Sequence, residues 1–247
     1  LGCKIEIDAK AGEVSIDVPK TLGHRADYDL VRKLRASINV LGPLITRVGQ
    51  AEVALPGGDA IGSRGLDFHI NGLTDMGAEI KLEHGFIVAN AKHGLSGSAI
   101  TLEFPSVGAT ENIMTAATLA KGVTTIENAA REPDVVDLGE FLISMGAKIS
   151  GIGSNMLIIE GVDELHGTEH TMLPDMIEIG SFIGLAVMTQ SEITIKNCQI
   201  PELGIIPEVF KKLGIKMEFR GDDIFIPSQE HYELENFIDG SMLTISD

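Results

Sequence analysis

The sequence has very few cysteines. Cys3 and Cys198 are the only two among its 247 residues, and they lie far apart in the chain. Two thiols at this separation exclude a disulfide framework, and neither has a second ligand nearby at the spacing of a metal site. We therefore expect both to be buried like small apolar side chains, with no bound metal ion, in a reducing, cytoplasmic environment.

Long hydrophobic runs are absent too. The longest apolar stretch, Met176–Met188, contains Glu178 and is shorter than the roughly 20 residues of a membrane-spanning helix. The chain opens with LGCKIEID, which has neither an initiator methionine nor the pattern of a signal peptide. We expect no membrane partner, and we expect the sequence to be part of a longer protein.

Basic residues are scarce as well. The chain has 19 Lys and Arg against 36 Asp and Glu, a formal net charge of −17 at pH 7. This balance argues against nucleic acid or an anionic membrane as a partner. The segment from Lys20 to Arg64 differs, because it contains seven basic residues and only four acidic ones. It is either a site for a small anion or a solvated helix face.

A short phrase occurs four times and predicts a repeated unit. Its copies are LGCKI (1–5), MGAEI (76–80), MGAKI (145–149) and LGIKM (213–217). Each copy leads into two extended segments joined by a polar turn, which predicts a pair of strands. Apolar residues at helical spacing precede the phrase, as at Leu138, Phe141, Leu142 and Met145. The glycine of each phrase therefore falls where a helix ends in a left-handed residue.

A second phrase has a similar period. KGVTTIEN (121–128) matches QSEITIKN (190–197), and GQAEVALP (49–56) is a looser copy. Each copy follows another helical pattern. The first of these patterns consists of Leu34, Ile38, Leu41 and Ile45. We predict an α/β fold of repeated βαβαββ units of about 70 residues around a shared core, incomplete at both ends.

Longer motifs run through these units. They are YDLVRKLRASINVLGPL (28–44), LPGGDAIGSR (55–64), FPSVGATENIM (104–114), IENAAREPDVVD (126–137), LISMGAKISG (142–151) and LPDMIEIGSF (173–182). In them the sequence resembles the UDP-N-acetylglucosamine 1-carboxyvinyltransferases, enolpyruvyl transferases of the EPSP synthase-like superfamily. The resemblance implies two domains, each an inside-out α/β barrel of three units, with substrates bound between them. Residues 1–172 would form one domain with a truncated first unit, and residues 173–247 the first unit of the other.

The resemblance also implies a reaction. The family transfers the enolpyruvyl group of phosphoenolpyruvate to the 3-hydroxyl of UDP-N-acetylglucosamine and releases phosphate, the first committed step of peptidoglycan synthesis. A proton must reach the methylene carbon, and Asp59 occupies the position of the general acid, where the family usually has cysteine. A free carboxylic acid is ionised at neutral pH, so Asp59 would need desolvation in a closed site. The preceding Gly57 and Gly58 would let such a loop close.

Other site residues are carried over from the same motifs. By resemblance, Arg35 and Arg64 contact the substrate, and the uridine is surrounded by Gly65, Leu66, Asp67 and Phe68. Gly65 stands where the family has a proline that packs on the uracil ring. We interpret the neighbouring His69 as a structural histidine.

Two further groups of residues complete the expected site. At the diphosphate the resemblance places Ser106, Val107 and Gly108, where a capped helix N-terminus would present free backbone N–H groups. The candidate cleft residues are Glu132, Asp175 and Glu178. In the last motif Met176 replaces the usual arginine, which removes a cation from the cleft.

Alternatives stay open. One is the related shikimate-pathway enolpyruvyl transferase, and the other is a non-catalytic paralogue or nucleotide-binding fragment. We expect UDP-N-acetylglucosamine and phosphoenolpyruvate as ligands and no cofactor. We also expect the chain alone to be inactive, since the resemblance places other substrate-binding residues and the base outside it.

Overall fold

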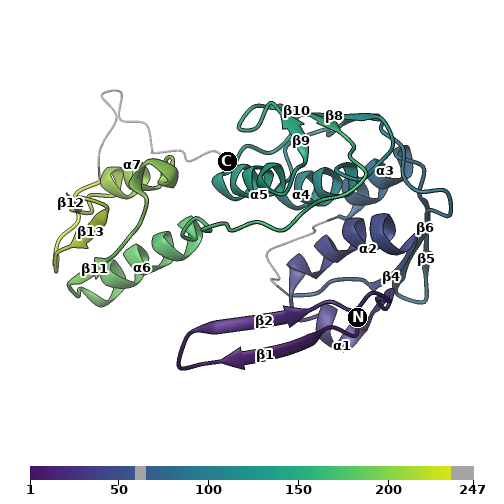
Figure 1. Ribbon diagram of the computed structural model, residues 1–247. Coiled ribbons are helices and arrows are strands. Elements are labelled where there is room, and N and C mark those ends of the chain that lie inside the picture. Colours follow the sequence, from purple (N-terminus) through teal and green to yellow (C-terminus); the bar gives the residue numbers. More distant parts are fainter. Residues whose placement is uncertain (59–64, 235–247) are drawn as a thin grey trace. The chain divides into compact units, whose positions relative to one another are not determined.

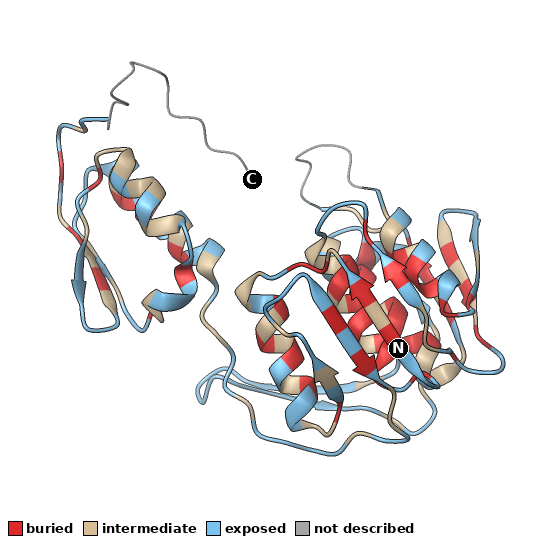
Figure 2. Ribbon diagram, turned by 90° about the horizontal axis from the view of Figure 1, so that it is seen from above, coloured by how far each residue is buried: buried red, intermediate tan, exposed pale blue. Residues whose placement is uncertain are grey.

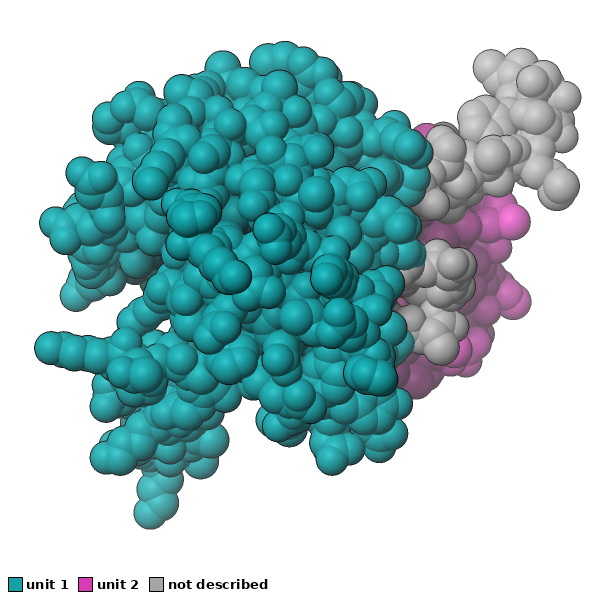
Figure 3. All heavy atoms as spheres, turned by 90° about the vertical axis from the view of Figure 1, so that its right-hand side faces the viewer, with its two compact units in different colours: residues 1–170 teal, residues 171–247 magenta. Residues whose placement is uncertain are grey.

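The structure is a computed structural model, and it describes residues 1–58 and 65–234. It divides into two compact units, residues 1–170 and residues 171–247 (Figures 1 and 3). Whether these units correspond to the domains expected from the family stays a prediction. Among the described helices, none is long and apolar enough to cross a membrane.

Unit 1 contains two four-stranded sheets of the same topology. The first has the order β3 (Arg25–Ala26), β4 (Gln50–Ala54), β6 (Phe86–Asn90), β5 (Glu79–Glu83). The second has the order β7 (Ala99–Thr101), β8 (Val123–Glu127), β10 (Met156–Glu160), β9 (Lys148–Ser150). In both, the first two strands are parallel and the remaining pairs antiparallel. The strand pairs predicted after MGAEI and MGAKI are β5–β6 and β9–β10, so that prediction is confirmed.

The alternation of side chains along the strands explains which face of each sheet is buried. In the first sheet Ala51 pairs with Ala89 and Val53 with Ile87, and all four side chains are buried. Residues between them in sequence point to the opposite face, because successive side chains in a strand alternate. One apolar face of each sheet is therefore available to pack against helices.

Helix α4 lies at the centre of unit 1. The helical segments of this unit are α1 (Tyr28–Val31), the 3₁₀ segment η1 (Arg35–Val40), α2 (Leu41–Val48), α3 (Asp67–Asp75), α4 (Val107–Ala117) and α5 (Pro133–Ser144). Helix α4 contacts η1, α2, α3 and α5. Its buried residues include Ala109, Ile113, Met114 and Ala116, and Figure 2 shows buried positions gathered on these helices. A helix that is apolar over most of its circumference belongs in a core.

One predicted helix is divided in two. The pattern of Leu34, Ile38, Leu41 and Ile45 predicted a continuous helix, but the chain forms η1 and then α2. The prediction was wrong because Pro43 lacks an N–H group to bond residue 39, whereas a proline fits the first turn of a new helix. Leu34 precedes η1 and is exposed.

Three of the four glycines of the repeated phrase end helices, as predicted; no described helix precedes the fourth, Gly2. Gly77 and Gly146 follow α3 and α5 with φ of 98° and 101°. At both, the glycine N–H bonds the carbonyl three residues back and the next N–H bonds the carbonyl five residues back. Gly214 repeats both bonds in unit 2. This pair of bonds satisfies the last helical carbonyls and requires a left-handed residue, which glycine adopts without strain.

The remaining elements lie at the two ends of the described chain. They are the hairpin β1 (Lys4–Asp8) and β2 (Glu13–Asp17), and in unit 2 α6 (Met176–Thr189), β11 (Ile193–Ile195), η2 (Ile200–Leu203), α7 (Ile206–Lys212), β12 (Glu218–Arg220) and β13 (Asp223–Ile226). The sheet of unit 2 has the order β11-β13-β12. Cys198 is buried in this unit, as predicted, while Cys3 is only partly buried; both are free thiols.

The close approach of α2 to α4 predicts how two glycine substitutions will differ. A Cβ at Gly42 would lie 2.5 Å from both the backbone O and Oδ1 of Asn112, whereas one at Gly184 in α6 would have nothing within 4 Å. Gly42→Ala should therefore lower the free energy of unfolding of unit 1 by about 2 kcal/mol. Gly184→Ala should raise that of unit 2 by roughly 0.5–1 kcal/mol, because alanine loses less entropy in a helix.

Urea unfolding followed through methyl NMR signals of each unit would measure both effects. Unchanged stability of the Gly42→Ala chain would contradict the close packing of α2 on α4.

Candidate active site

A cavity of ≈ 1140 Å³ opens in unit 1. Its described lining residues come from three segments and one further carboxylate. They are Lys33–Arg35, Ala36, Ile38 and Asn39; Gly58, Gly65, Asp67–His69 and Asn71; Glu103, Phe104, Ser106–Gly108 and Glu111; and Asp134. These segments are far apart in sequence and meet because η1, α3 and α4 pack together. Seven of the predicted site residues thus line one cavity.

Arg35 and Lys33 give the cavity two cations. Arg35 begins η1, and its Nη2 donates to the Gly65 carbonyl at 3.2 Å. The Gly65 backbone is therefore tied to the start of η1. A planar guanidinium in this position suits an anionic oxygen pair, for which arginine is better shaped than lysine.

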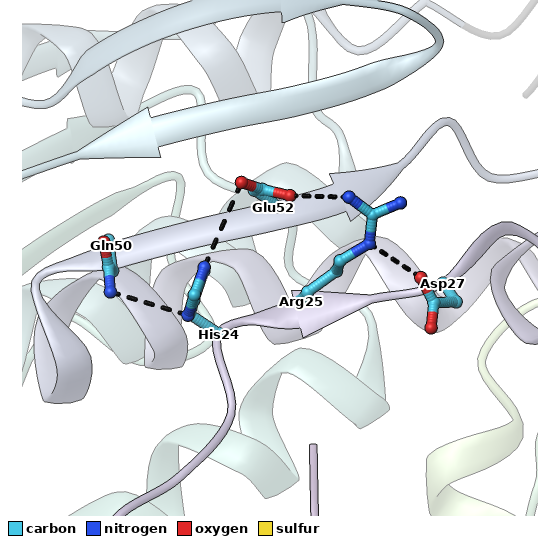
Figure 4. Close-up of polar contacts among 5 residues, drawn as sticks. All are labelled: His24, Arg25, Asp27, Gln50 and Glu52. Carbon is cyan, nitrogen blue, oxygen red and sulfur yellow. Dashed lines mark hydrogen bonds and ion pairs between the residues drawn. The ribbon is translucent and has the colours of Figure 1, made fainter.

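Side chains anchor strand β3, which precedes Lys33 and Arg35 in the sequence. Arg25 donates through Nε to Asp27 at 2.8 Å and through Nη1 to Glu52 of β4 at 2.9 Å (Figure 4). Its guanidinium also lies 4.2 Å above the centre of the Phe86 ring. The two-residue strand β3 has few ladder bonds of its own, so these side chains help to hold it against β4 and β6.

Gly57 and Gly58 pack against the backbone of residues 32–35. A Cβ at Gly57 would overlap the carbonyl O of Arg32, and one at Gly58 would lie 3.2 Å from the carbonyl O of Lys33. Gly58 also has φ of 75°. From the sequence we expected these glycines to let the loop close. At this end of the loop they allow two backbone segments to approach each other closely.

The N-terminus of α4 faces the cavity with open backbone donors. Thr110 N–H bonds Ser106 O at 2.9 Å and closes the first turn, so the N–H groups of Val107, Gly108 and Ala109 have no acceptor inside the helix. Ser106 is the N-cap residue, as expected, but its hydroxyl makes no capping bond. The helix end can therefore bind an anion with both backbone and hydroxyl donors.

Two phenylalanines form an aromatic part of the cavity wall. Phe68 and Phe104 meet edge to face, with ring centroids 4.7 Å apart. Leu66 does not line the cavity and instead packs against the core of unit 1. A Cβ at Gly65 would overlap Oδ2 of Asp67, so the proline usual in the family could not sit here with Asp67 in this conformation.

His69 is buried and hydrogen-bonded, in agreement with its interpretation as a structural histidine. It is 6% exposed, and its Nδ1 lies 3.0 Å from Nδ2 of Asn112. Burial, with a smaller contribution from the charge of Arg35, lowers the pKa of His69 to about 4. The imidazole is therefore neutral at physiological pH.

Asn39 and Glu111 form a second polar pair at the cavity. Nδ2 of Asn39 donates to Oε2 of Glu111 at 2.6 Å. Burial raises the pKa of Glu111, and the charge of Asp134 adds to this, while the bond from Asn39 opposes it. The protonated form of this carboxyl is thus favoured more than in a free glutamate.

The described lining of the cavity does not include every predicted residue. Asp59 and Arg64 lie outside the described residues. Glu132 precedes α5, and its Oε2 accepts from Arg131 N–H at 2.8 Å. In unit 2, Asp175 caps α6 by accepting from the N–H groups of Ile177 and Glu178. Glu178 is exposed in the first turn of α6.

Eight residues at or beside the cavity were not predicted from the sequence, and a local pattern could have indicated two of them. The eight are Lys33, Asn39, Asn71, Glu103, Phe104, Glu111, Asn112 and Asp134. Glu111 and Asn112 are adjacent carboxylate and amide residues in a helix whose other side chains are small or apolar apart from two threonines, a pattern that indicates buried polar contacts. The others carry no local pattern. Within the described ranges, no group of three or more His, Cys, Asp or Glu could hold a metal ion.

Solved structures define the class of fold. The enolpyruvyl transferase NikO from Streptomyces tendae superposes with a TM-score of 0.78 at 20% identity, covering 93% of this chain and 55% of that one. EPSP synthase from Acinetobacter baumannii superposes with a TM-score of 0.62 at 21% identity, covering 92% and 54%. The chain has the fold of these enolpyruvyl transferases.

Sequence comparison gives the family. The model of the family EPSP synthase (3-phosphoshikimate 1-carboxyvinyltransferase) matches residues 1–247, and the chain belongs to this family. Among its relatives are UDP-N-acetylglucosamine 1-carboxyvinyltransferases from Bacteroides thetaiotaomicron, 56% identical over 216 residues, and Porphyromonas gingivalis, 54% over 217. Each match covers 87% of this chain and 50% of the relative. The resemblance seen in the motifs is confirmed, and the chain spans about half the length of these relatives.

The low pKa of His69 predicts a loss of stability in mild acid. The pKa falls from a usual 6.5 to about 4 on folding, so between these values the unfolded chain binds a proton that the folded chain does not. Stability is therefore lost as the pH falls through this window. From pH 7 to pH 5 the free energy of unfolding of unit 1 should decrease by about 2 kcal/mol from this residue.

Urea unfolding of the original chain and of His69→Phe at both pH values would isolate the effect, since the other ionisable groups are common to both. An equal pH dependence in the two chains would contradict the assignment.

Proposed function

We propose that this chain forms part of an enzyme that transfers the enolpyruvyl group of phosphoenolpyruvate to the 3-hydroxyl of UDP-N-acetylglucosamine, with release of phosphate. The observation that carries the proposal is the cavity of unit 1. It combines Arg35, the segment after the glycine loop, and the N-terminus of α4, and all three belong to motifs shared with the family. The named relatives support this choice of acceptor.

In this proposal different residues of the cavity bind different parts of the nucleotide. The open N–H groups of Val107 and Gly108 and the free hydroxyl of Ser106 bind diphosphate oxygens. Arg35 adds a charge-assisted bond. Asp67 and Phe68 hold the uridine, with Leu66 supporting them from the core. Gly65 has no ring to pack on the base, and we propose that Phe104, which meets Phe68 in the cavity wall, packs on it instead.

Asp59 and Arg64 supply the chemistry in this proposal. Asp59 donates the proton to the methylene carbon of phosphoenolpyruvate as the sugar oxygen attacks the neighbouring carbon and gives up its hydroxyl proton to a base. Phosphate then leaves as a base removes a proton from the new methyl group, which restores the double bond. Arg64 stabilises the anionic groups of the substrates. The loop starts from Gly57 and Gly58, which pack against the segment that carries Arg35. Glu132, Asp175 and Glu178 are proposed as cleft residues of the complete enzyme.

The proposal also includes the domain architecture of the complete protein. The identical order of the two sheets in unit 1 and the shared capping bonds support repeated units of about 70 residues. We propose that residues 1–172 and 173–247 belong to two inside-out barrel domains of a cytoplasmic protein. A non-catalytic nucleotide-binding paralogue is the second candidate, because Met176 and Gly65 replace an arginine and a proline usual in the family.

Calorimetry with UDP-N-acetylglucosamine tests the nucleotide site. Arg35→Ala should weaken binding by about tenfold or more, because a charge-assisted hydrogen bond at the cavity is lost. Arg47→Ala is the matched control, since it removes the same charge from an exposed position of α2 outside the cavity. Equal affinities of the two variants would contradict the site, and absence of binding by the folded original chain would contradict it outright.

A chimera tests the reaction. The chain would replace the matching segment of the Bacteroides thetaiotaomicron relative, and phosphate release from phosphoenolpyruvate would be measured with UDP-N-acetylglucosamine or shikimate 3-phosphate as acceptor. We expect activity with the first acceptor and its loss in Asp59→Asn. Because carboxylates are weak nucleophiles toward epoxides and thiolates strong ones, fosfomycin should inactivate only the Asp59→Cys chimera. Stoichiometric alkylation at Asp59, seen by intact mass, would contradict this.

A further inference from the structure

Asn112 joins the core of unit 1 to the cavity through a chain of hydrogen bonds. The residue is 1% exposed. Its Oδ1 accepts from the backbone N–H of Gly42 at 2.7 Å, and its Nδ2 donates to the carbonyl of Ile38 at 3.2 Å. The same Nδ2 lies 3.0 Å from Nδ1 of His69. These contacts involve η1, α2, α3 and α4.

The partners of Asn112 determine where the proton of His69 lies. A backbone N–H can only donate, so the amide atom that faces Gly42 must be the oxygen. The other amide atom is then the nitrogen, which can only donate and which finds an acceptor in the Ile38 carbonyl. Nδ1 of His69 must therefore accept, and the neutral imidazole carries its hydrogen on Nε2.

This Nε2–H group opens onto the cavity beside α4. His69 lines the cavity, and a Cβ at Gly108 would lie 3.4 Å from Cε1 and 3.6 Å from Nε2 of its ring. Among the described residues, none forms a hydrogen bond with Nε2. His69 is 6% exposed, and Nε2 is the ring nitrogen left without a hydrogen bond from the described residues. It lies at the cavity next to the open N–H groups of the helix N-terminus, so a ligand in the cavity can supply its acceptor.

We propose that the Nε2–H of His69 is a fixed, neutral hydrogen-bond donor to a phosphoryl oxygen of the nucleotide, and that Asn112 is the positioning residue that fixes this tautomer. The inference rests on the proposed function, since it assigns the nucleotide diphosphate to this end of α4. Lys33 and Arg35 supply positive charge at the cavity, whereas His69 supplies an uncharged hydrogen-bond donor with a fixed direction. Its low pKa keeps the donor in one state across the neutral range.

NMR of the chain with ¹⁵N-labelled histidine tests the tautomer. We expect His69, identified by the signal missing in His69→Phe, to show the Nε2–H pattern at pH 7 and to keep it at pH 5.5. Asn112→Asp would place an acceptor beside Nδ1, so the titration of His69 should move up into the range of pH 5–8. An Nδ1–H tautomer in the original chain would overturn the inference, whether or not the Asn112 variant folds.

Ligand titrations test the role of the donor. UDP should shift the Nε2–H signal of His69, and uridine, which lacks phosphate, should not. His69→Phe should weaken UDP by about tenfold and leave uridine unchanged, whereas His93→Phe, at an exposed position outside the cavity, should change neither.

The outcomes separate the two proposals. If UDP binds and the His69 signal and affinity stay unaffected, the inference fails alone. If phosphoenolpyruvate shifts His69 and UDP does not, the nucleotide assignment of this donor is overturned. If UDP does not bind the folded chain, the proposed function fails, and this inference fails with it.

Discussion

The Asn112 side chain accepts a hydrogen bond from the Gly42 N–H inside the core, and this bond governs how the helices of unit 1 meet. Gly42 lies in the first turn of α2, where a backbone N–H has no helical acceptor. Its missing side chain lets α2 come close enough for Asn112 to reach that N–H. Close packing and polar satisfaction therefore depend on each other, because a side chain at residue 42 would remove the space that the bond requires.

The position of the cavity follows from this packing. Helix α4 packs against α2, η1 and α3. Its first turn, the residues at the start of η1 and the start of α3 therefore all line the same cavity. Gly72 of α3 contributes in the same way, since a Cβ there would overlap Ile113. Glycines on two helices thus bring three chain segments to one place, and the site residues converge without a long loop having to reach across.

Sequence periodicity predicted those features that depend on neighbouring residues. The strand pairs, the helix-ending Gly77 and Gly146 and the N-cap position of Ser106 all follow from local patterns. The contacts that organise the site join residues 43, 70 and 72 positions apart: Asn112 with His69, Asn112 with Gly42, and Glu111 with Asn39. No local pattern specifies such partners. The division between η1 and α2 was not predicted for another reason. The helical spacing of the apolar residues was given more weight than Pro43, which indicates the start of a new helix.

The anion proposed for the cavity would bind to a chain with a net charge of −17, so the charges inside the cavity matter. Four carboxylates line it together with two cations, so its formal charge is negative; they are Asp67, Glu103, Glu111 and Asp134, and Lys33 and Arg35. Burial raises the pKa of Glu111, and Oδ1 of Asn39 is buried without a hydrogen-bond partner among the described residues. A protonated Glu111 could donate to that oxygen after a half-turn of the amide, since the two amide atoms are alike in shape. An anion bound nearby would favour the same protonation, because it raises the cost of a second negative charge. The charge of the ligand and the protonation state of Glu111 are then coupled. Hydrogen bonds and charges inside the cavity, more than the net charge of the chain, then determine which ligand binds.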